Sequence, residues 1–425
     1  MKNTLNAEIL SVGTELLLGS TTNTDARDIS IYLSELGINV FYHTVVGDNP
    51  ERLTKAVEIA RKRADVIITT GGLGPTCDDL TKQVLASAFD LEMVLHEELA
   101  EEIKRYFKEV IGVDTMTENN LQQAYLPDGC TVFHNEWGTA PGCAFESKGV
   151  RVIMLPGPPR ECNAMFKACA MPYLRALSDE VILSHNLNIV GSGESTVESK
   201  LVDMMNELTN PTLAPYAKEG EVQLRITAKA KTAEEAEKMT KPVIERVRAV
   251  LGDIIYGMDV ASLEQVVFEL LCEKDMTIST AESCTGGLIA KRITDLRGSS
   301  KAFIGGAVTY AAESKTSVLG VAPELIEKFG VISAEVASEM AKKARELFKS
   351  SIAVATTGLA GPEGDGINPV GTVFVALATE SEVFVTKLSS GFGRARVRTL
   401  ASNCALDMTR RYLTQRPVVV DYHKR

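Results

Sequence analysis

The sequence contains few of the residues and patterns from which metal sites, disulfide frameworks and membrane segments are built. Its eight cysteines form no C-x-x-C pair, and its five histidines leave positions 186–422 without one. We therefore expect neither a zinc site nor a disulfide framework. No apolar run reaches the ~18 residues of a membrane span, and no signal peptide is recognisable. We expect a cytoplasmic protein without a membrane partner.

The chain also has no net positive charge. The chain of 425 residues carries a net charge of -11, whereas binding to a nucleic-acid backbone depends on a positive field. We therefore expect no direct nucleic-acid binding. A chain of this length exceeds one typical hydrophobic core, and its composition, 45% hydrophobic and 24% charged, is typical of a globular protein with two or three domains.

Residues 1–172 alternate between strands and helices. An apolar strand is predicted over 7–12, and Asn49 followed by Pro50 predicts the start of a helix. A second strand is predicted over 38–46, and the next one, an apolar strand at 65–70, leads into a glycine-rich loop. This alternation predicts a largely parallel sheet with helices on both faces, and the ligands of such sheets bind at the carboxyl ends of the strands.

Residues 175–255 have a different pattern, typical of a small α+β module. The segment 221–230 alternates polar and apolar residues, and Thr232 with Glu235 forms a capping box for the next helix. We expect Pro242 to kink that helix. The module has no G-x-x-G loop, so the sequence does not support nucleic-acid binding through such a loop.

From 262 onward the pattern returns to alternating strands and helices. A strand is predicted directly before Ser283. Further strands are predicted at 303–310, 351–357, 371–378 and 383–388, and helices at 263–274, 333–349 and 394–413.

In the first region, the glycine-rich loop that ends at Thr76 precedes Asp78 and Asp79, which we place at the start of a helix. Glycines and a helix N-terminus suit a phosphate, and paired carboxylates beside a phosphate indicate a bridging divalent cation. Alternatively, Asp78 caps the helix and Asp79 complements its dipole. The residues alone leave both interpretations open.

The run from Thr280 to Gly287 places a hydroxyl, a thiol and two glycines in one turn between a strand and a helix. Such a turn can present a nucleophile beside free backbone N–H groups, which suit an oxyanion or a phosphate. Ser283 can instead cap the helix, and Cys284 can be either a rival nucleophile or a buried small residue.

A serine nucleophile needs a neighbouring base. Because histidine is absent from 186–422, a Ser–Lys pair is the economical alternative, and Lys315 follows the predicted strand that ends at Tyr310. Lysine acts as a base only where burial or another cation lowers its pKa. The alternative for Lys315 is an ordinary solvated helix lysine.

Several runs resemble the CinA family, and together they extend over the whole chain. They are GGLGPTCDDLTK, NEWGTAPG and LPGPPRE in the first region, and TAESCTGGLIAKRIT, GSSKAFIGGAVTYAAESK, GVIS, TTGLAGPEGDG and PVGTVFVAL in the last. The resemblance implies an α/β protein, which forms a homodimer. Its parts are an N-terminal molybdopterin-binding-like α/β/α domain (1–172), a small KH-type α+β module (175–255), a C-terminal CinA-type α/β/α deamidase domain (262–414) and a tail (415–425).

For the last domain the resemblance implies a nicotinamide mononucleotide deamidase, which needs no cofactor. Ser283 is then the nucleophile, Lys315 the base, and Tyr310 a residue at the substrate. N–H groups of the 284–287 turn or of the 358–361 loop hold the oxyanion. The nucleotide phosphate is held by Arg394 or, preferably, Arg398, unless both are ordinary surface arginines. The other substrate-binding candidates are Cys284, Thr285, Gly286, Gly287, Thr357, Gly358, Ala360 and Gly361.

For the first domain the resemblance implies a pyrophosphatase that cleaves ADP-ribose with a divalent metal ion. The candidate metal or water ligands are Asp78, Asp79, Glu15 and Asp48, and the candidate phosphate contacts are Lys82 and Arg160. The other candidates for the nucleotide site are Gly13, Gly71, Gly72, Gly74, Thr76, Thr81, Asn135, Gly138, Thr139, Gly157, Pro158 and Glu161. The alternative hypothesis is a binder of pterins or nucleotides without hydrolytic activity, in a regulatory protein associated with competence.

Overall fold

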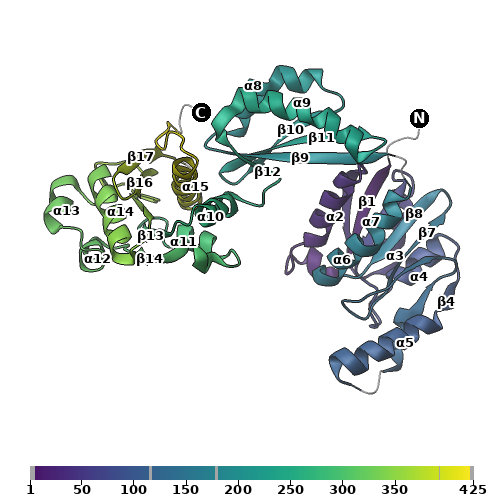
Figure 1. Ribbon diagram of the computed structural model, residues 1–425. Helices are drawn as coiled ribbons and strands as arrows, with labels where there is room; N and C mark the ends of the chain where they lie inside the picture. Colours follow the sequence, from purple (N-terminus) through teal and green to yellow (C-terminus); the bar gives the residue numbers. More distant parts are fainter. Residues whose placement is uncertain (1–4, 114–116, 178–179, 392, 422–425) are drawn as a thin grey trace. The chain divides into compact units, whose positions relative to one another are not determined.

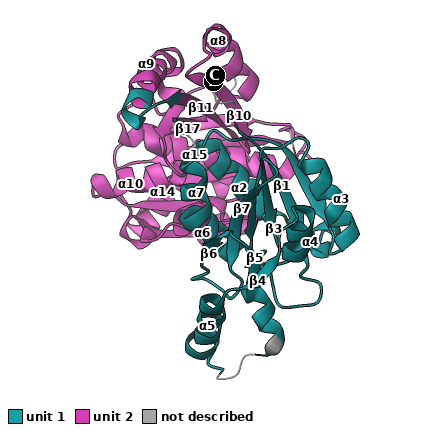
Figure 2. Ribbon diagram, turned by 90° about the vertical axis from the view of Figure 1, so that its right-hand side faces the viewer, with its two compact units in different colours: residues 1–183, 229–236 teal, residues 184–228, 237–425 magenta. Residues whose placement is uncertain are grey.

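The computed structural model describes residues 5–113, 117–177, 180–391 and 393–421. The chain forms two compact units, one of residues 1–183 with 229–236 and the other of 184–228 with 237–425 (Figure 2). The middle module thus groups mainly with the C-terminal domain. In the described part of the chain, no helix is long and apolar enough to cross a membrane. All eight cysteines are free thiols.

A six-stranded sheet forms the centre of the first unit, in the order β2-β1-β3-β8-β7-β6. Its strands are β1 (Asn6–Val12), β2 (Asn39–Val46), β3 (Val66–Thr70), β6 (Thr131–Phe133), β7 (Gly142–Ser147) and β8 (Val150–Leu155). Strands β2, β1, β3 and β8 are parallel, as the sequence pattern predicts. Strand β7 is antiparallel to β8, and β6 is antiparallel to β7. The carboxyl ends of β1, β3 and β8 therefore meet at one edge of the sheet.

Helices cover both faces of this sheet (Figure 1). Those on one face are α2 (Thr24–Glu35), α6 (Pro159–Met165) and α7 (Met171–Arg175), and those on the other are α3 (Pro50–Ala60) and α4 (Thr81–Ala88). Helix α5 (Glu97–Tyr106) lies beyond the end of the sheet (Figure 1). Shorter elements are α1 (Thr14–Leu17), β4 (Met93–Leu95), η1 (Phe107–Ile111), η2 (Glu118–Ala124), β5 (Tyr125–Pro127) and η3 (Phe166–Ala170). The sequence-based expectation for α3 is confirmed, because the side chain of Asn49 accepts a hydrogen bond from Arg52 N and caps the helix.

The middle module is a four-stranded sheet, in the order β10-β11-β9-β12, with two helices packed on it. Its elements are β9 (Val181–Val190), α8 (Glu194–Glu207), β10 (Thr212–Lys218), β11 (Glu221–Ala230), α9 (Ala233–Leu251), η4 (Gly252–Ile254) and β12 (Ile255–Met258). The expected cap of α9 is present, because Glu235 N donates to Thr232 Oγ1 at 3.2 Å. The helix runs on through Pro242 as a single element.

The C-terminal domain has a five-stranded sheet in the order β14-β13-β15-β16-β17. Strands β14, β13 and β15 are parallel, β16 is antiparallel to β15, and β17 is antiparallel to β16. Helix α14 packs on one face, and α10, α11 and α15 pack on the other. The elements are α10 (Leu263–Glu273), β13 (Ile278–Glu282), α11 (Leu288–Thr294), η5 (Ser299–Lys301), β14 (Phe303–Val308), α12 (Ala312–Ser317), α13 (Pro323–Phe329), α14 (Ala334–Phe348), β15 (Ile352–Gly358), β16 (Thr372–Ala378), β17 (Val383–Ser389) and α15 (Gly393–Leu413).

The long helix α15 joins this domain to the middle module. Asn403 Nδ2 donates to Gly220 O at 3.0 Å, and Arg411 forms an ion pair with Asp253 at 2.6 Å. Both contacts lie within the second compact unit. One face of α15 thus lies against the module while the other lies against the sheet.

Candidate active site

Ser283 lies in a tight turn at the carboxyl end of a buried central strand. All five residues of β13 are buried, and the strand has parallel neighbours on both sides. Strand β13 continues to Glu282, beyond the apolar residues that predicted it. The turn before α11 is therefore limited to residues 283–287. Gly286 and Gly287 have φ of 60° and 87°, a left-handed conformation that favours glycine. The two glycines therefore allow the chain to reverse sharply and leave Ser283 at the edge of the sheet.

The side chain of Lys315, on α12, meets that of Ser283. Lys315 is wholly buried, and its Nζ lies 3.0 Å from Ser283 Oγ and 2.7 Å from Thr309 O. Burial lowers the pKa of Lys315 from 10.5 to about 8, because the charged form loses its hydration. A lysine in this environment is partly neutral near pH 8 and can take a proton from a hydroxyl group.

Cys284, the other candidate nucleophile, belongs to the hydrophobic core. Its side chain is 4% exposed, and burial raises its pKa to about 11. The thiol is therefore uncharged at neutral pH, and only the thiolate is a strong nucleophile. Of the two interpretations that the sequence leaves open, this environment is that of a buried small residue.

The turn also supplies backbone donors that have no protein partner. Among the described residues, the N–H groups of Cys284, Thr285 and Gly287 donate to no other residue, whereas Ser283 N donates to Thr356 O at 3.0 Å. Neighbouring free N–H groups can stabilise an anionic oxygen. The turn can therefore hold an oxyanion next to the serine hydroxyl.

Glu282 holds this turn in place, a role that sequence reasoning missed. Its buried carboxylate accepts hydrogen bonds from Ile289 N at 3.1 Å and Ala290 N at 2.9 Å, in the first turn of α11. These bonds tie the end of β13 to the start of α11 and thereby fix the segment between them. The signal in the sequence is an acidic residue that ends a buried strand directly before the turn.

Tyr310, Arg394 and Arg398 lie around this turn but make different contacts. Arg394 NH2 donates to Tyr310 Oη at 2.7 Å and NH1 donates to Gly361 O at 3.2 Å. Arg398 donates through both Nε and NH2 to Thr285 O. The arginine that the sequence favoured as the phosphate ligand therefore braces the turn, while the exposed Arg394 is better placed to meet a ligand.

The end of β15 and the loop that follows it are fixed by their own close contacts. Thr357 Oγ1 donates to Val331 O at 2.8 Å, and Ala360 is buried. Gly358 leaves no room for a side chain, because an added Cβ would lie 2.4 Å from Thr372 O. These substrate-binding candidates thus position the loop, and the carbonyl of Gly361 holds Arg394.

In the N-terminal domain, the glycine-rich loops gather at the carboxyl edge of the sheet. Gly71 N donates to Leu155 O at 3.1 Å, and Thr81 Oγ1 donates to Gly71 O at 2.9 Å. A Cβ on Gly157 would lie 3.2 Å from the Cα of Gly71, and one on Gly72 would lie 2.1 Å from Thr81 Oγ1. These glycines are required by the close packing of the loops, a reason independent of any phosphate.

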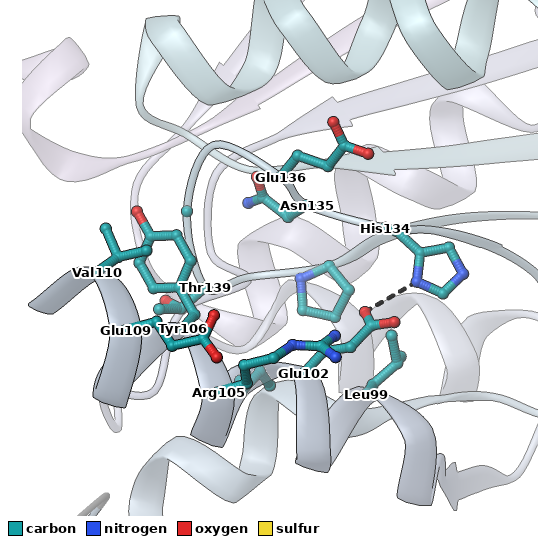
Figure 3. Close-up of a pocket in the computed structure, with 13 residues that line it drawn as sticks. Leu99, Glu102, Arg105, Tyr106, Glu109, Val110, His134, Asn135, Glu136 and Thr139 are labelled. Atoms are coloured by element: carbon teal, nitrogen blue, oxygen red, sulfur yellow. Dashed lines mark hydrogen bonds and ion pairs between the residues drawn. The ribbon is translucent and has the colours of Figure 1, made fainter. Parts of the chain in front are cut away.

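A second group of candidates meets beside α6. Asn135 Nδ2 donates to Glu161 Oε2 at 2.7 Å, and burial raises the pKa of Glu161. Gly138 lies so close to this carboxylate that a Cβ there would be 1.9 Å from Glu161 Oε2. Asn135, Gly138 and Thr139 also line a cavity of about 450 Å³ beside α5, with Arg105 on its other side (Figure 3). Arg160 is exposed in the first turn of α6, two residues after Pro158, the N-cap residue.

The ammonium group of Lys82 is not directed to a ligand. Its Nζ donates to Gln122 O at 2.8 Å and to Gln123 O at 3.0 Å, and burial lowers its pKa to about 8. The structure thus gives this lysine a structural contact in place of the expected phosphate contact. Helix α4 begins at Thr81 with Leu80 as its N-cap residue, so Asp78 does not cap it.

The candidate metal ligands do not form a ready-made metal site. Asp79 Oδ2 accepts hydrogen bonds from Thr76 N and Thr76 Oγ1, and Asp48 Oδ2 accepts one from Thr14 N. Glu15 lies in the short helix α1. Within the described ranges, no three His, Cys, Asp or Glu side chains converge so that they could hold a metal ion. The carboxylates present therefore do not fit a divalent ion as a set.

Three known protein families match consecutive stretches of the chain. Residues 8–176 match the family described as a probable molybdopterin binding domain, residues 184–257 the damage-inducible protein CinA KH domain, and residues 260–413 the CinA C-terminal domain. Together these matches account for the three parts of the fold.

Related proteins match over nearly the full length. A CinA-like protein of Dictyoglomus thermophilum is 49% identical, with 96% of this chain and 99% of the relative covered. A CinA-like protein of Kosmotoga olearia is 47% identical with the same coverage. The crystal structure of the protein CinA from Thermoplasma acidophilum is 33% identical and covers 40% of this chain and 99% of its own, with a TM-score of 0.36. The chain belongs to the CinA family of competence/damage-inducible proteins.

Proposed function

We propose that the C-terminal domain hydrolyses the carboxamide of nicotinamide mononucleotide to nicotinate mononucleotide and ammonia. The observation that carries this proposal is the 3.0 Å contact between Ser283 Oγ and Nζ of the buried Lys315. A serine with a lysine as its base is one of the recurring arrangements of acyl-transfer enzymes. Resemblance to the CinA deamidases supports the choice of substrate, and the exposed Arg394 offers a ligand for its phosphate.

In the first step, Ser283 Oγ attacks the amide carbon. The uncharged Nζ of Lys315 accepts the hydroxyl proton as the C–O bond forms. Thr309 O, at 2.7 Å, accepts one N–H of this amine and so turns its lone pair toward the serine. The amide oxygen becomes an oxyanion, which the unpaired N–H groups of Cys284 and Thr285 can hold.

In the second step, the C–N bond breaks. The Lys315 ammonium gives its proton to the departing nitrogen, so that ammonia leaves and an ester remains on Ser283. Water then attacks the ester carbon, and Lys315 takes the proton of this water and returns it to Ser283 Oγ. The products are the carboxylic acid and the free enzyme, and the acid then ionises in water and its proton converts the released ammonia to ammonium.

The test is ammonia release from nicotinamide mononucleotide by the full-length protein. Ser283→Ala and Lys315→Met should each lower kcat by about a thousandfold or more. Ser300→Ala and Lys301→Met change the same residue types at exposed positions nearby, and should retain the wild-type rate. Near-normal ammonia release by Ser283→Ala would refute the proposal.

For the N-terminal domain we propose binding of ADP-ribose and its cleavage to AMP and ribose 5-phosphate. The supporting observations are the loops gathered at the carboxyl edge of the sheet and the cavity lined by Asn135 and Thr139. The donor set does not fit a divalent ion as it stands, so the described carboxylates alone do not account for a metal-dependent step.

AMP formation from ADP-ribose tests this second proposal. AMP formation that is lost with a chelator and in Asp79→Ala would support metal-dependent hydrolysis that requires this loop, whereas AMP formation unaffected by both would contradict a role for a metal ion and for Asp79, and no AMP formation would contradict cleavage itself. If neither ADP-ribose nor nicotinamide mononucleotide is consumed, the alternative is favoured: a regulatory protein that binds nucleotides or pterins without hydrolysing them, associated with competence as the family's name suggests.

A further inference from the structure

Arg292 lies in a network of hydrogen bonds next to the Ser283 turn, by which we mean residues 283–287. It belongs to α11, which begins at Leu288, directly after this turn. Its side chain is 15% exposed, and its guanidinium group contacts α15, α10 and the middle module, all within the second compact unit. None of the residues that it contacts is a candidate for catalysis or for substrate binding.

Two hydrogen bonds of Arg292 tie α11 to α15. Its NH1 donates to Ser402 Oγ at 2.9 Å and to Asn403 Oδ1 at 2.6 Å. Ser402 lies about one helical turn after Arg398, whose Nε and NH2 donate to Thr285 O. Both helices thus hold the Ser283 turn, α11 through the chain itself and α15 through Arg398. Arg292 fixes one of these helices to the other.

The same network reaches the middle module. Asn403 Nδ2 donates to Gly220 O at 3.0 Å, at the tip of the hairpin between β10 and β11. Gly220 has φ of 76°, and a Cβ there would lie 2.8 Å from Asn403 Nδ2. A side chain at this position would therefore be strained and would push against the amide group. Through its two amide atoms, Asn403 links Arg292 to the backbone of the module.

Two carboxylates complete the network. Arg292 NH2 donates to Glu264 Oε2 on α10 at 2.6 Å, and it lies 3.9 Å from Glu221 Oε1 in the hairpin of the module. Glu221 also accepts a hydrogen bond from Tyr256 Oη at 2.7 Å, and burial raises the pKa of its carboxyl group. Arg292 is thus the cation shared by one carboxylate of the domain and one of the module. A planar guanidinium group can make all these contacts at once, whereas an ammonium group cannot.

We propose that Arg292 is a positioning residue for the Ser283 site, and that the hairpin tip of the middle module, residues 219–221, supports the site through it. The free N–H groups of the Ser283 turn stabilise an oxyanion only at the correct distance from the substrate. A displacement of about 1 Å can cost about a hundredfold in rate. The middle module is thereby part of the structure that holds the catalytic turn in place.

The expected consequence of weakening the network, which rests on the proposed deamidase activity, is a lower kcat at an almost unchanged KM. The oxyanion forms only as the reaction proceeds, so displaced N–H donors remove an interaction that the bound substrate does not make. A merely structural role would have a different effect. Loss of folded protein would lower the number of active molecules and leave the kcat of each one unchanged.

Hydrogen–deuterium exchange on the full-length protein tests this support without reference to any activity. Gly220→Ala should speed exchange at residues 284–294, which comprise most of the turn and α11, because the added Cβ meets Asn403 Nδ2. Gly149→Ala is the matched control. Gly149 has φ of 78° in the two-residue turn between β7 and β8, and a Cβ there meets no atom within 4 Å. This variant carries the same backbone strain without the contact, and exchange at 284–294 should stay unchanged.

Substitution of the arginine tests the centre of the network. Arg292→Lys keeps a positive charge beside Glu264 but cannot make the forked contacts to α15. It should lower kcat per folded molecule by about tenfold, with KM within about twofold of the wild type. Arg297→Lys makes the same exchange at an exposed position just after α11 and should keep the wild-type kcat. Arg292→Lys should also speed exchange at 284–294, so the exchange test does not depend on the folding of Gly220→Ala.

Exchange at 284–294 that is equal in Gly220→Ala and Gly149→Ala would overturn the support by the hairpin tip. A kcat of Arg292→Lys equal to that of Arg297→Lys would overturn the positioning role. If the wild type itself releases no ammonia from nicotinamide mononucleotide, the proposed deamidase activity is refuted. Exchange at 284–294 then still decides whether the network holds the turn.

Discussion

Replacing Lys315 by methionine should abolish amide hydrolysis and yet stabilise the fold at neutral pH. The wild-type lysine is wholly buried, and burial lowers its pKa from 10.5 to about 8. At pH 7 it is therefore held mostly in its charged form in a site that disfavours charge. Lowering the pKa of the lysine from 10.5 to about 8 corresponds to about 3 kcal/mol of destabilisation. Methionine has a similar length and carries no charge.

The substitution also removes hydrogen bonds. Thr309 O and Ser283 Oγ each lose the ammonium group as a partner, and leaving a buried acceptor unpaired costs about 1–3 kcal/mol. With a cost of about 1 kcal/mol for each of the two acceptors, Lys315→Met should be more stable than the wild type by about 1 kcal/mol at pH 7.

The sign of this difference should change with pH. Because the folded-state pKa lies below the unfolded one, the destabilisation by Lys315 is fully present below about pH 8. It is relieved as the pH rises from there toward 10.5, where the unfolded chain also loses the proton. Near pH 10 little of this destabilisation of the wild type remains, so the cost of the hydrogen bonds lost in the variant is the larger effect. Lys315→Met should then be the less stable protein.

Calorimetric unfolding of the full-length wild type and of Lys315→Met at both pH values checks this reasoning. Lys301→Met, at an exposed site nearby, is the matched control and should show no such crossover. A Lys315→Met variant that unfolds at a lower temperature than the wild type at both pH values would refute the argument, because the lysine would then carry no desolvation cost.

Three further outcomes follow from the contacts of the site. Glu282→Gln keeps one acceptor oxygen for the N-terminus of α11 and should therefore retain a higher kcat than Glu282→Ala, with KM little changed in both. Equal kcat values in the two variants would contradict the positioning role of Glu282. Because burial raises the pKa of Cys284 to about 11, iodoacetamide at neutral pH should leave ammonia release intact, and rapid inactivation mapped to this thiol would contradict that assignment. Arg394→Gln should raise KM by about tenfold, and a loss confined to kcat would show that the arginine does not serve substrate binding.

The sequence predicted those parts of the fold that depend on local pattern. Periodic apolar residues and caps located α3, α9 and most strands of the C-terminal domain, because these elements bury one regular face. The antiparallel pairing of β7 with β8 and of β6 with β7 was not predicted, because strand direction depends on short connections and distant partners that no local period records. Helix α9 continues through Pro242, and the residues that follow the proline, Val243, Ile244, Val247 and Leu251, pack in the core of the module.

In the candidate site, too, some features follow from the sequence and others depend on contacts made only in the folded chain. The absence of histidine from 186–422 and the family resemblance together predicted a Ser–Lys pair. The fold brings Ser283 and Lys315 together. The direction of Lys82 and the role of Glu282 depend on hydrogen bonds to residues from other turns and helices, which a linear pattern does not contain. The cavity between the middle module and the C-terminal domain is likewise formed by two regions whose contact exists only in the folded chain.

The most direct test of the central claim, that an uncharged Lys315 activates Ser283, is the pH dependence of kcat/KM for ammonia release from nicotinamide mononucleotide. The account predicts a rise of about tenfold per pH unit below the lysine's pKa, which is about 8, and a plateau above it. A profile that stays flat across that range, in an enzyme whose activity still requires Ser283, would contradict it.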